Sequence, residues 1–189
     1  MPTLENLNPH APFPADRARQ IARAFAPRRP WGNWWDYSYT RIKLGSDPLY
    51  PGAIAALRHH PAPVLDLGCG LGLFAHAMRA AGLEQPYRGI DIDAAKIRRG
   101  QRIVQRTGLA GVELQVHDLS AGWPAHHGSV TILDVLQYLD GPTQHALLND
   151  AAGMLGPDGV LVIRSTLAED SARGRTSLRA DAWAHRIGW

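Results

Sequence analysis

Residues 64–75 of this 189-residue chain read VLDLGCGLGLFA, and this stretch decides the fold. Its first four residues form an apolar run short enough for a buried strand. Gly68, Gly70 and Gly72 follow at alternate positions, and beyond them apolar residues recur at helical spacing. The pattern predicts a strand, a tight glycine turn and a helix whose free N–H groups face the turn.

The glycine turn predicts a cradle for a cofactor, because a backbone without Cβ atoms can approach a ligand closely. The dinucleotide fingerprint needs a glycine three places after Gly70, and that place holds Leu73, which argues against a nicotinamide-dependent oxidoreductase. The spacing is instead Asp66-x-Gly68-x-Gly70-x-Gly72. It resembles motif I of the class I S-adenosylmethionine-dependent methyltransferases. A structural turn in some other α/β protein is the alternative for this stretch taken alone.

The composition fits one domain with a real core, since 45% of the residues are apolar. No apolar stretch approaches the length of a membrane span, and the N-terminus lacks the apolar core of a secretory signal. The lone cysteine, Cys69, cannot form an internal disulfide. We therefore expect a cytoplasmic protein. The net charge of +3 is mild and does not indicate a nucleic-acid partner.

The first 46 residues are expected to form an N-terminal arm that acts as a lid, ahead of an α/β domain over residues 47–189. A short helix is predicted over residues 15–25. Prolines flank the arginine-rich residues 15–29, which favours a surface helix over a transit peptide.

Half of the six tryptophans lie within residues 31–35. This aromatic cluster either packs the arm onto the domain or lines a substrate pocket, where aromatic faces attract a sulfonium cation. The residues expected in the pocket are Trp34, Tyr37, Tyr39, Lys43 and Gln137.

Four further strands are predicted, over residues 87–91, 112–116, 129–135 and 160–164, in alternation with helices. Five such alternations predict a doubly wound, Rossmann-like parallel sheet with helices on both faces. A ligand should lie beyond the carboxyl ends of the strands, beside the first strand. Gly100, inside the second of these helices, predicts close packing on the sheet.

Acidic residues follow the predicted strands. Asp91 ends the second strand, where a carboxylate accepts hydrogen bonds from ribose hydroxyls, and Asp93 is placed to cap the next helix. Asp118 follows the third strand, and the methyltransferase resemblance implies that it receives the adenine amino group. The resemblance covers about residues 60–165. It implies S-adenosyl-L-methionine as the cofactor, bound by Asp66, Gly68, Cys69, Gly70, Gly72, Asp91, Ile92, Asp118, Leu119 and Asp134.

The fourth strand runs into Asp134-Val-Leu-Gln137-Tyr138, which resembles the family's motif IV with Gln137 in place of the usual histidine. The resemblance implies methyl transfer to a small-molecule acceptor, and we expect an oxygen nucleophile. An oxygen nucleophile benefits from a general base, for which the candidates are His117 and Tyr138, with His126 or His127 as further options. Gln137 cannot act as a base but can orient a substrate. The alternative is a protein that binds S-adenosylmethionine without turnover. No metal is expected.

Two further features bear on partners. The tyrosine pattern at Tyr37 and Tyr39, followed by Lys43 and residues 47–50, resembles a bacterial subgroup found with fatty-acid or aryl-polyene pigment enzymes. The basic residues of the second helix, Lys96 to Arg106, read as a solvated face or as a docking surface for an acidic carrier protein.

The C-terminal residues depart from the family pattern. Class I methyltransferases usually finish with two further strands, whereas residues 165–189 predict a loop and one helix. By its sequence the sheet is expected to lack the last two strands of the family, which predicts an open edge beside the fifth strand and either self-association into a homo-oligomer or marginal stability as a monomer.

Overall fold

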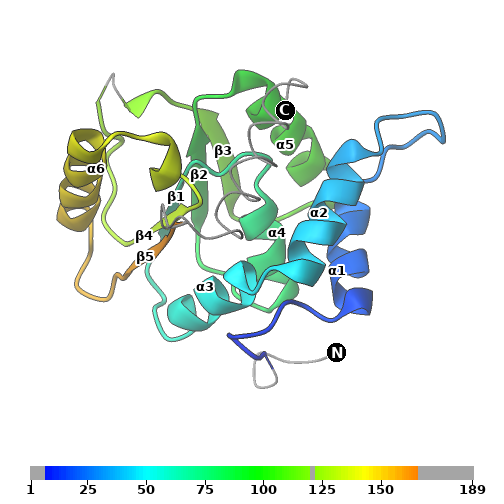
Figure 1. Ribbon diagram of the computed structural model, residues 1–189, viewed down its shortest axis with the longest axis horizontal. Coiled ribbons are helices and arrows are strands. Elements are labelled where there is room, and N and C mark those ends of the chain that lie inside the picture. Colours follow the sequence, from blue (N-terminus) through cyan, green and yellow to red (C-terminus); the bar gives the residue numbers. More distant parts are fainter. Residues whose placement is uncertain (1–6, 120–121, 166–189) are drawn as a thin grey trace.

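The computed structural model describes residues 7–119 and 122–165. Five parallel strands form one sheet in the order β3-β2-β1-β4-β5 (Figure 1). The chain moves outward from β1 in one direction and then in the other, so the predicted doubly wound sheet is confirmed. The strands are β1 (Val64–Leu67), β2 (Tyr87–Asp91), β3 (Val112–Val116), β4 (Ser129–Leu133) and β5 (Leu161–Arg164).

Helices cover both faces of the sheet. Leu65 and Leu67 of β1 pack in a cluster with Leu147 and Ala151 of α6, whereas Val64 belongs to a second cluster with α3, α4 and α5. Figure 1 shows α6 on one side of the sheet and α4 on the other. The helices are α1 (Ala15–Ala22), α2 (Trp35–Ser46), α3 (Leu49–Leu57), α4 (Leu73–Ala80), α5 (Ala94–Thr107) and α6 (Gly141–Gly153), with short 3-10 helices η2 (Arg23–Phe25) and η4 (Leu136–Tyr138).

Most local signals act as the sequence predicts. Oδ1 of Asp93 accepts hydrogen bonds from Ala95 and Lys96 at the start of α5, which confirms its role as a cap. A Cβ on Gly100 would lie 2.8 Å from the carbonyl oxygen of Leu71, so close packing explains this helical glycine.

Helix α2 is the element that the sequence analysis missed. Its buried residues are Asp36, Thr40 and Leu44, two of them polar, while Trp35 and Ile42 remain partly or largely exposed. The apolar residues of α2 are therefore not confined to one side of the helix. The 3.6-residue periodicity from which a surface helix is predicted is weak here.

The N-terminal segment packs into the core of the domain. Phe13, Ile21, Phe25 and Leu44 belong to the same hydrophobic cluster as Phe74 of α4. The helix expected over residues 15–25 is present as α1 and η2, with Ile21 and Phe25 buried. The division at residue 46 and the lid function remain predictions.

Strand β4 ends two residues earlier than expected, at Leu133. The next residue, Asp134, has a φ of 59°, a left-handed conformation that aspartate tolerates better than most residues and that ends the strand. The predicted C-terminal helix lies outside the described residues, so the expected open edge stays a prediction. None of the helices in the described ranges has the length and apolar character needed to cross a bilayer.

Candidate cofactor and acceptor site

The glycine turn after β1 has the geometry of a cradle. Gly68, Gly70 and Gly72 all have left-handed backbones, with φ of 80°, 56° and 75°. A Cβ added to Gly68 would collide with Val135, whereas one added to Gly70 would meet nothing within 4 Å. The turn is thus closed on its inner side and open above Gly70, where a ligand can approach the backbone.

The end of β2 holds this turn in place. The backbone N–H groups of Gly68 and Cys69 both donate to the carbonyl oxygen of Ile90, over 2.8 Å and 3.0 Å. The Asp91 carboxylate accepts from Gly70 N–H through Oδ2, at 2.9 Å, and from Asp93 N–H through Oδ1, at 2.8 Å. Asp91 therefore borders the open space above Gly70, and its role in binding ribose remains a prediction.

Asp66 lies beneath the turn and is 3% exposed. Its Oδ1 accepts a hydrogen bond from the Thr131 hydroxyl at 2.6 Å, and its Oδ2 accepts a short one from the Tyr87 hydroxyl. Burial raises the pKa of Asp66 to about 6, although these two hydrogen bonds act against the rise. The Asp66 carboxylate therefore lies inside the sheet, beneath the turn, and does not line the open space above Gly70.

The other residues expected on the cofactor side follow β2 and β3. Ile92 is 69% exposed beside Asp91. The His117 N–H donates to the Asp91 carbonyl oxygen at 3.0 Å, which brings the end of β3, with Asp118 and Leu119, against the end of β2. Cys69 is buried in the turn, and this burial raises the pKa of its thiol well above the ordinary value.

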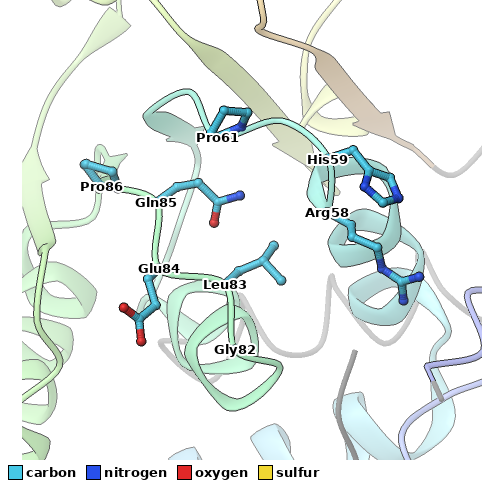
Figure 2. A pocket seen from close by; sticks show the side chains of 8 residues that line it. All are labelled: Arg58, His59, Pro61, Gly82, Leu83, Glu84, Gln85 and Pro86. Atoms are coloured by element: carbon cyan, nitrogen blue, oxygen red, sulfur yellow. The ribbon is translucent and has the colours of Figure 1, made fainter. Parts of the chain in front are cut away.

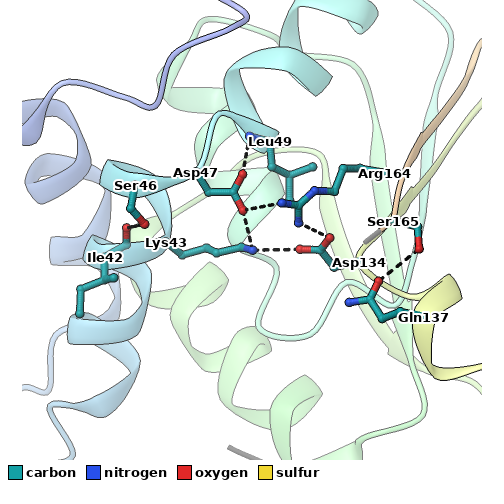
Figure 3. Close-up of polar contacts among 9 residues, drawn as sticks. All are labelled: Ile42, Lys43, Ser46, Asp47, Leu49, Asp134, Gln137, Arg164 and Ser165. Carbon is teal, nitrogen blue, oxygen red and sulfur yellow. Dashed lines mark hydrogen bonds and ion pairs between the residues drawn. The ribbon is translucent and has the colours of Figure 1, made fainter. Parts of the chain in front are cut away.

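Four charged side chains form a ring at the ends of β4 and β5 (Figure 3). Lys43 Nζ lies 2.7 Å from Asp47 Oδ2 and 2.9 Å from Asp134 Oδ2. Arg164 Nη2 lies 3.1 Å from Asp47 Oδ2, and Arg164 Nη1 forms a short ion pair with Asp134 Oδ1. The ring joins α2 to the carboxyl ends of two strands.

Mutual attraction outweighs desolvation within this ring. Burial alone would lower the pKa of Lys43, but the charges of Asp134 and Asp47 raise it. Burial would raise the pKa of Asp47, but the Lys43 ammonium lowers it. The Asp134 and Asp47 carboxylates likewise raise the pKa of Arg164, so Lys43, Asp47 and Arg164 are held in their charged forms at neutral pH.

The structure brings together only part of the predicted substrate pocket. Tyr39 and Lys43 lie one helical turn apart on α2, and Gln137 lies near the ring, where its Oε1 accepts from the Ser165 hydroxyl at 3.4 Å. Trp34 packs edge-to-face on Tyr37, with ring centroids 5.5 Å apart. A hollow of about 200 Å³ follows α2 and is lined by Trp35, Ser38, Tyr39, Ile42, Lys43 and Ser46.

The two principal base candidates lie on different sides of the glycine turn. His117 follows β3 and Tyr138 ends η4 after β4, and β2 and β1 separate these strands. Three strand spacings amount to about 14 Å, so the two side chains do not converge on one atom. His126 and His127 precede β4 and lie at the opposite, amino edge of the sheet, where His126 Nε2 contacts the Ser129 carbonyl. Their candidacy as bases near the site was wrong.

A larger hollow, of about 480 Å³, also lies at the amino edge (Figure 2). It is formed by the end of α3 and the segment that leads into β2, so it is remote from the glycine turn. Its lining residues are Arg58, His59, Pro61, Gly82, Leu83, Glu84, Gln85 and Pro86.

The sequence analysis missed four contributors to these sites: Tyr87 and Thr131, which hold Asp66, and Asp47 and Arg164, which complete the ring. Arg164 is the last residue of β5, as Asp91 is of β2. The argument that placed Asp91 in the site, its position at the carboxyl end of a strand, therefore applies to Arg164 as well. Nothing local in the sequence marks Tyr87 or Thr131, because they meet Asp66 only through the register of the sheet.

Comparison with known proteins agrees with this geometry. The sequence pattern of the family described as "Methyltransferase domain" matches residues 64–159. The ribosomal protein L11 methyltransferase of Pseudomonas aeruginosa is 31% identical over 130 residues, which are 67% of this chain and 42% of that protein. The ubiquinone biosynthesis O-methyltransferase of Xanthomonas campestris pv. campestris is 29% identical over 136 residues, 71% of this chain and 56% of the relative. The chain thus spans about half the length of these curated relatives.

Solved structures support the same fold. The magnesium protoporphyrin IX methyltransferase of Synechocystis PCC 6803, determined with bound S-adenosylhomocysteine, superposes with a TM-score of 0.56 at 20% identity, over 89% of this chain and 73% of that one. The family match covers the glycine turn, Asp91 and the β4 end together. This chain therefore belongs to the methyltransferase domain family, and its fold is that of the S-adenosylmethionine-dependent methyltransferases.

Proposed function

We propose that this chain binds S-adenosylmethionine at the glycine turn and transfers its methyl group to an oxygen atom of a small-molecule acceptor. The observation that carries the proposal is the left-handed Gly70 with open space above it, hydrogen-bonded to Asp91. An oxygen acceptor is supported by the O-methyltransferase among the relatives. The relative named for ribosomal protein L11 makes a protein acceptor the rival outcome.

The cofactor side of the proposal uses the ends of β1, β2 and β3. Each oxygen of Asp91 accepts one backbone hydrogen bond and keeps a lone pair for a ribose hydroxyl. The exposed Ile92, with Leu119, supplies apolar contact for the adenine ring, and Asp118 accepts from its amino group. The bound cofactor supplies an activated methyl group on a sulfonium, so the chain has to position the acceptor and exclude water.

The acceptor side of the proposal uses the charged ring and its neighbours. Lys43, Gln137 and Tyr138 lie around the end of β4, and Lys43 also lines the hollow along α2. Tyr138 is the base candidate on this side of the glycine turn. Gln137 orients the acceptor through its amide.

In this proposal the N-terminal arm, residues 1–46, serves as the lid. Helix α2 is attached at both ends to elements that border the site: Asp36 Oδ2 lies 3.3 Å from Arg99 Nε on α5, and Lys43 bonds Asp134 after β4. Ligand binding should therefore change the fluorescence of Trp35, measured as the difference between the wild type and Trp35→Phe. A difference spectrum that does not change on addition of either cofactor or acceptor contradicts the proposal that this segment is a lid.

The test separates binding from turnover. Calorimetric titration with S-adenosylmethionine, S-adenosylhomocysteine and NADH should show binding of the first two only. A panel of hydroxyaryl compounds and carboxylic acids, read by the mass gain of one methyl group, should then identify an acceptor. Binding without methylation of any compound or protein acceptor supports the alternative, a binding protein without turnover, for which Gln137 in the motif IV position is the favouring observation.

A further inference from the structure

Helix α5 carries a row of arginines on its outer side. Arg98, Arg102 and Arg106, called the arginine row below, recur at intervals of four residues, so they lie on one side of the helix and about 6 Å apart along its axis. All three are exposed. The residues that α5 buries occur at other positions: Ile97, Gly100 and Ile103. The arginine row therefore faces away from the sheet.

No carboxylate in the described part of the chain neutralises the arginine row. Within residues 7–119 and 122–165, α5 takes part in two ion pairs. Lys96 Nζ lies 4.0 Å from Asp93 Oδ2, and Arg99 Nε lies 3.3 Å from Asp36 Oδ2. Both carboxylates are thus engaged with other cations, and the row keeps its positive charge.

The loop between η2 and α2, residues 26–34, begins and ends at α5. Just before the loop, Arg106 Nη2 donates a short hydrogen bond to the Ala24 carbonyl oxygen. Just after it, the contact between Asp36 and Arg99 joins the start of α2 to α5. Two anchors one helical face apart therefore place the loop next to the arginine row.

This loop adds an aromatic ring and more positive charge to the same surface. Trp31 is 81% exposed, and Arg28 and Arg29, which closely precede it, are exposed as well. The Trp34 Nε1–H donates to the Pro30 carbonyl oxygen at 2.8 Å and so holds the loop in shape. The Trp31 ring is thus available for stacking by another molecule.

The net charge of +3 is the sum of two unequal parts. Residues 15–35 and 94–107 contain ten of the twenty lysines and arginines but one of the seventeen acidic residues. These two segments, which the contacts above bring together, therefore carry a charge of +9, and the rest of the chain carries −6. A surface of one sign on a nearly neutral chain is typical of a site for a polyanion.

We propose that the arginine row and residues 26–34 bind a single-stranded nucleic acid, with phosphates on the arginines and one unpaired base on Trp31. The inference goes beyond methyl transfer and does not depend on it. Guanidinium groups hold phosphates through paired hydrogen bonds, and regularly spaced cations suit a polymer with a charge on every repeating unit. A duplex keeps its bases stacked on each other, so an exposed ring favours a single strand.

An acidic protein is the rival occupant of this surface. Protein interfaces have an apolar core, whereas α5 has no large apolar side chain among its exposed residues. The exposed apolar group that the loop contributes, Trp31, is surrounded in sequence by arginines and not by other apolar residues. The surface therefore fits phosphates and a base better than it fits a protein.

The experiment titrates labelled twelve-nucleotide oligouridylate and oligothymidylate with the full chain and follows fluorescence anisotropy. Both should bind, with affinities within about threefold, because the proposed contacts do not involve the 2′-hydroxyl. Five arginines on five phosphates should give a slope of about −3.5 in a plot of log K against log salt concentration. Because these measurements use the wild type, they decide the proposal even where a variant does not fold.

Arg98→Gln and Arg102→Gln should each weaken binding about fivefold and make the salt slope shallower by about 0.7. Arg88→Gln is the matched control. Arg88 alternates on β2 with Tyr87, which packs in the same cluster as Ile97 of α5, so the Arg88 side chain lies on the opposite face of the sheet. This control should bind like the wild type.

Trp31→Ala should weaken binding about fivefold or more and leave the salt slope unchanged, because stacking releases no counterions. Trp31→Phe should restore most of the affinity. Circular dichroism shows that each variant is folded.

Four results would overturn the proposal. Wild-type protein that binds neither oligonucleotide at 50 mM salt would make this a solvated face. Poly-L-glutamate that displaces the oligonucleotide at equal charge concentration would indicate an acidic protein partner. Equal loss of affinity in Arg88→Gln and Arg98→Gln would mean that only the total charge matters. Unchanged affinity in Trp31→Ala would exclude the stacked base.

Discussion

The Gly70 N–H donates a hydrogen bond of 2.9 Å to Oδ2 of Asp91, so the end of β2 holds the turn that follows β1. Asp91 therefore has two consequences for ligand binding. Its carboxylate borders the open space above Gly70, and it also fixes the backbone that forms the floor of that space. A change at Asp91 should affect binding through both.

Asp91→Ala should weaken S-adenosylhomocysteine binding by about one to two orders of magnitude. Ribose hydroxyls left without an acceptor in a closed site cost about 1–3 kcal/mol, and the Gly70 N–H loses its partner as well. Calorimetry gives the dissociation constant. Asp93→Ala is the control, since it removes only the cap of α5 and should lower stability while leaving affinity close to the wild type. An unchanged dissociation constant in folded Asp91→Ala would remove this residue from the site.

Gly70→Val should abolish cofactor binding while the circular dichroism spectrum stays close to that of the wild type. The branched side chain would occupy the space above the turn and would strain a backbone with a φ of 56°. Gly82→Val is the matched control, because Gly82 also has a left-handed backbone, with a φ of 84°, and open space around its Cβ position. Normal binding by Gly70→Val would place the cradle elsewhere.

Asp66→Asn should stabilise the protein at pH 8 and not at pH 4. The folded-state pKa of about 6 lies above the ordinary aspartate value, so the folded protein binds this proton more tightly than the unfolded chain. The contribution is then fully favourable below about pH 4 and is lost as the pH rises through 6. Denaturant titrations of both proteins should differ by about 1–3 kcal/mol at pH 8. A variant that is less stable than the wild type at both pH values contradicts the assignment.

Lys43→Met and Asp134→Asn should be coupled in a double-mutant cycle. Their side chains are 22% and 20% exposed, so solvent screens the ion pair only in part. We expect a coupling energy of about 1–2 kcal/mol in the free energy of unfolding. Arg41→Met serves as the control, because Arg41 is exposed on the same helix. Additivity of Lys43→Met and Asp134→Asn would mean that the ring contributes little to stability.

The parts of the fold that could be predicted from the sequence depend on local chemistry. Gly68, Gly70 and Gly72 mark the turn because their φ angles suit glycine, and Asp93 marks the start of α5 because a carboxylate there accepts backbone hydrogen bonds. Strands β2 and β3 have the predicted bounds: apolar and polar residues alternate along Val112–Val116, and Tyr87–Asp91 ends at a carboxylate.

The parts that could not be predicted depend on contacts between distant residues. Helix α2 escaped detection because its buried Thr40 and Asp36 are polar and its exposed Trp35 is not. Asp66 and Thr131 are partners through strand register, 65 residues apart. His117 and Tyr138 both follow strands, yet only the strand order shows that they lie on different sides of β1.

The charged ring also sets an order in which the molecule can be completed during synthesis. Arg164 pairs with Asp47 across 117 residues, and both Lys43 and Asp47 leave the ribosome long before β4 and β5. Until those strands join the sheet, Lys43 and Asp47 can form an ion pair only with each other among the members of the ring, over four residues of the chain. The C-terminal end of α2 therefore gains its ion pairs with the ends of β4 and β5 only once those strands are in the sheet, and a nascent chain that stops before β5 lacks Arg164 of the ring.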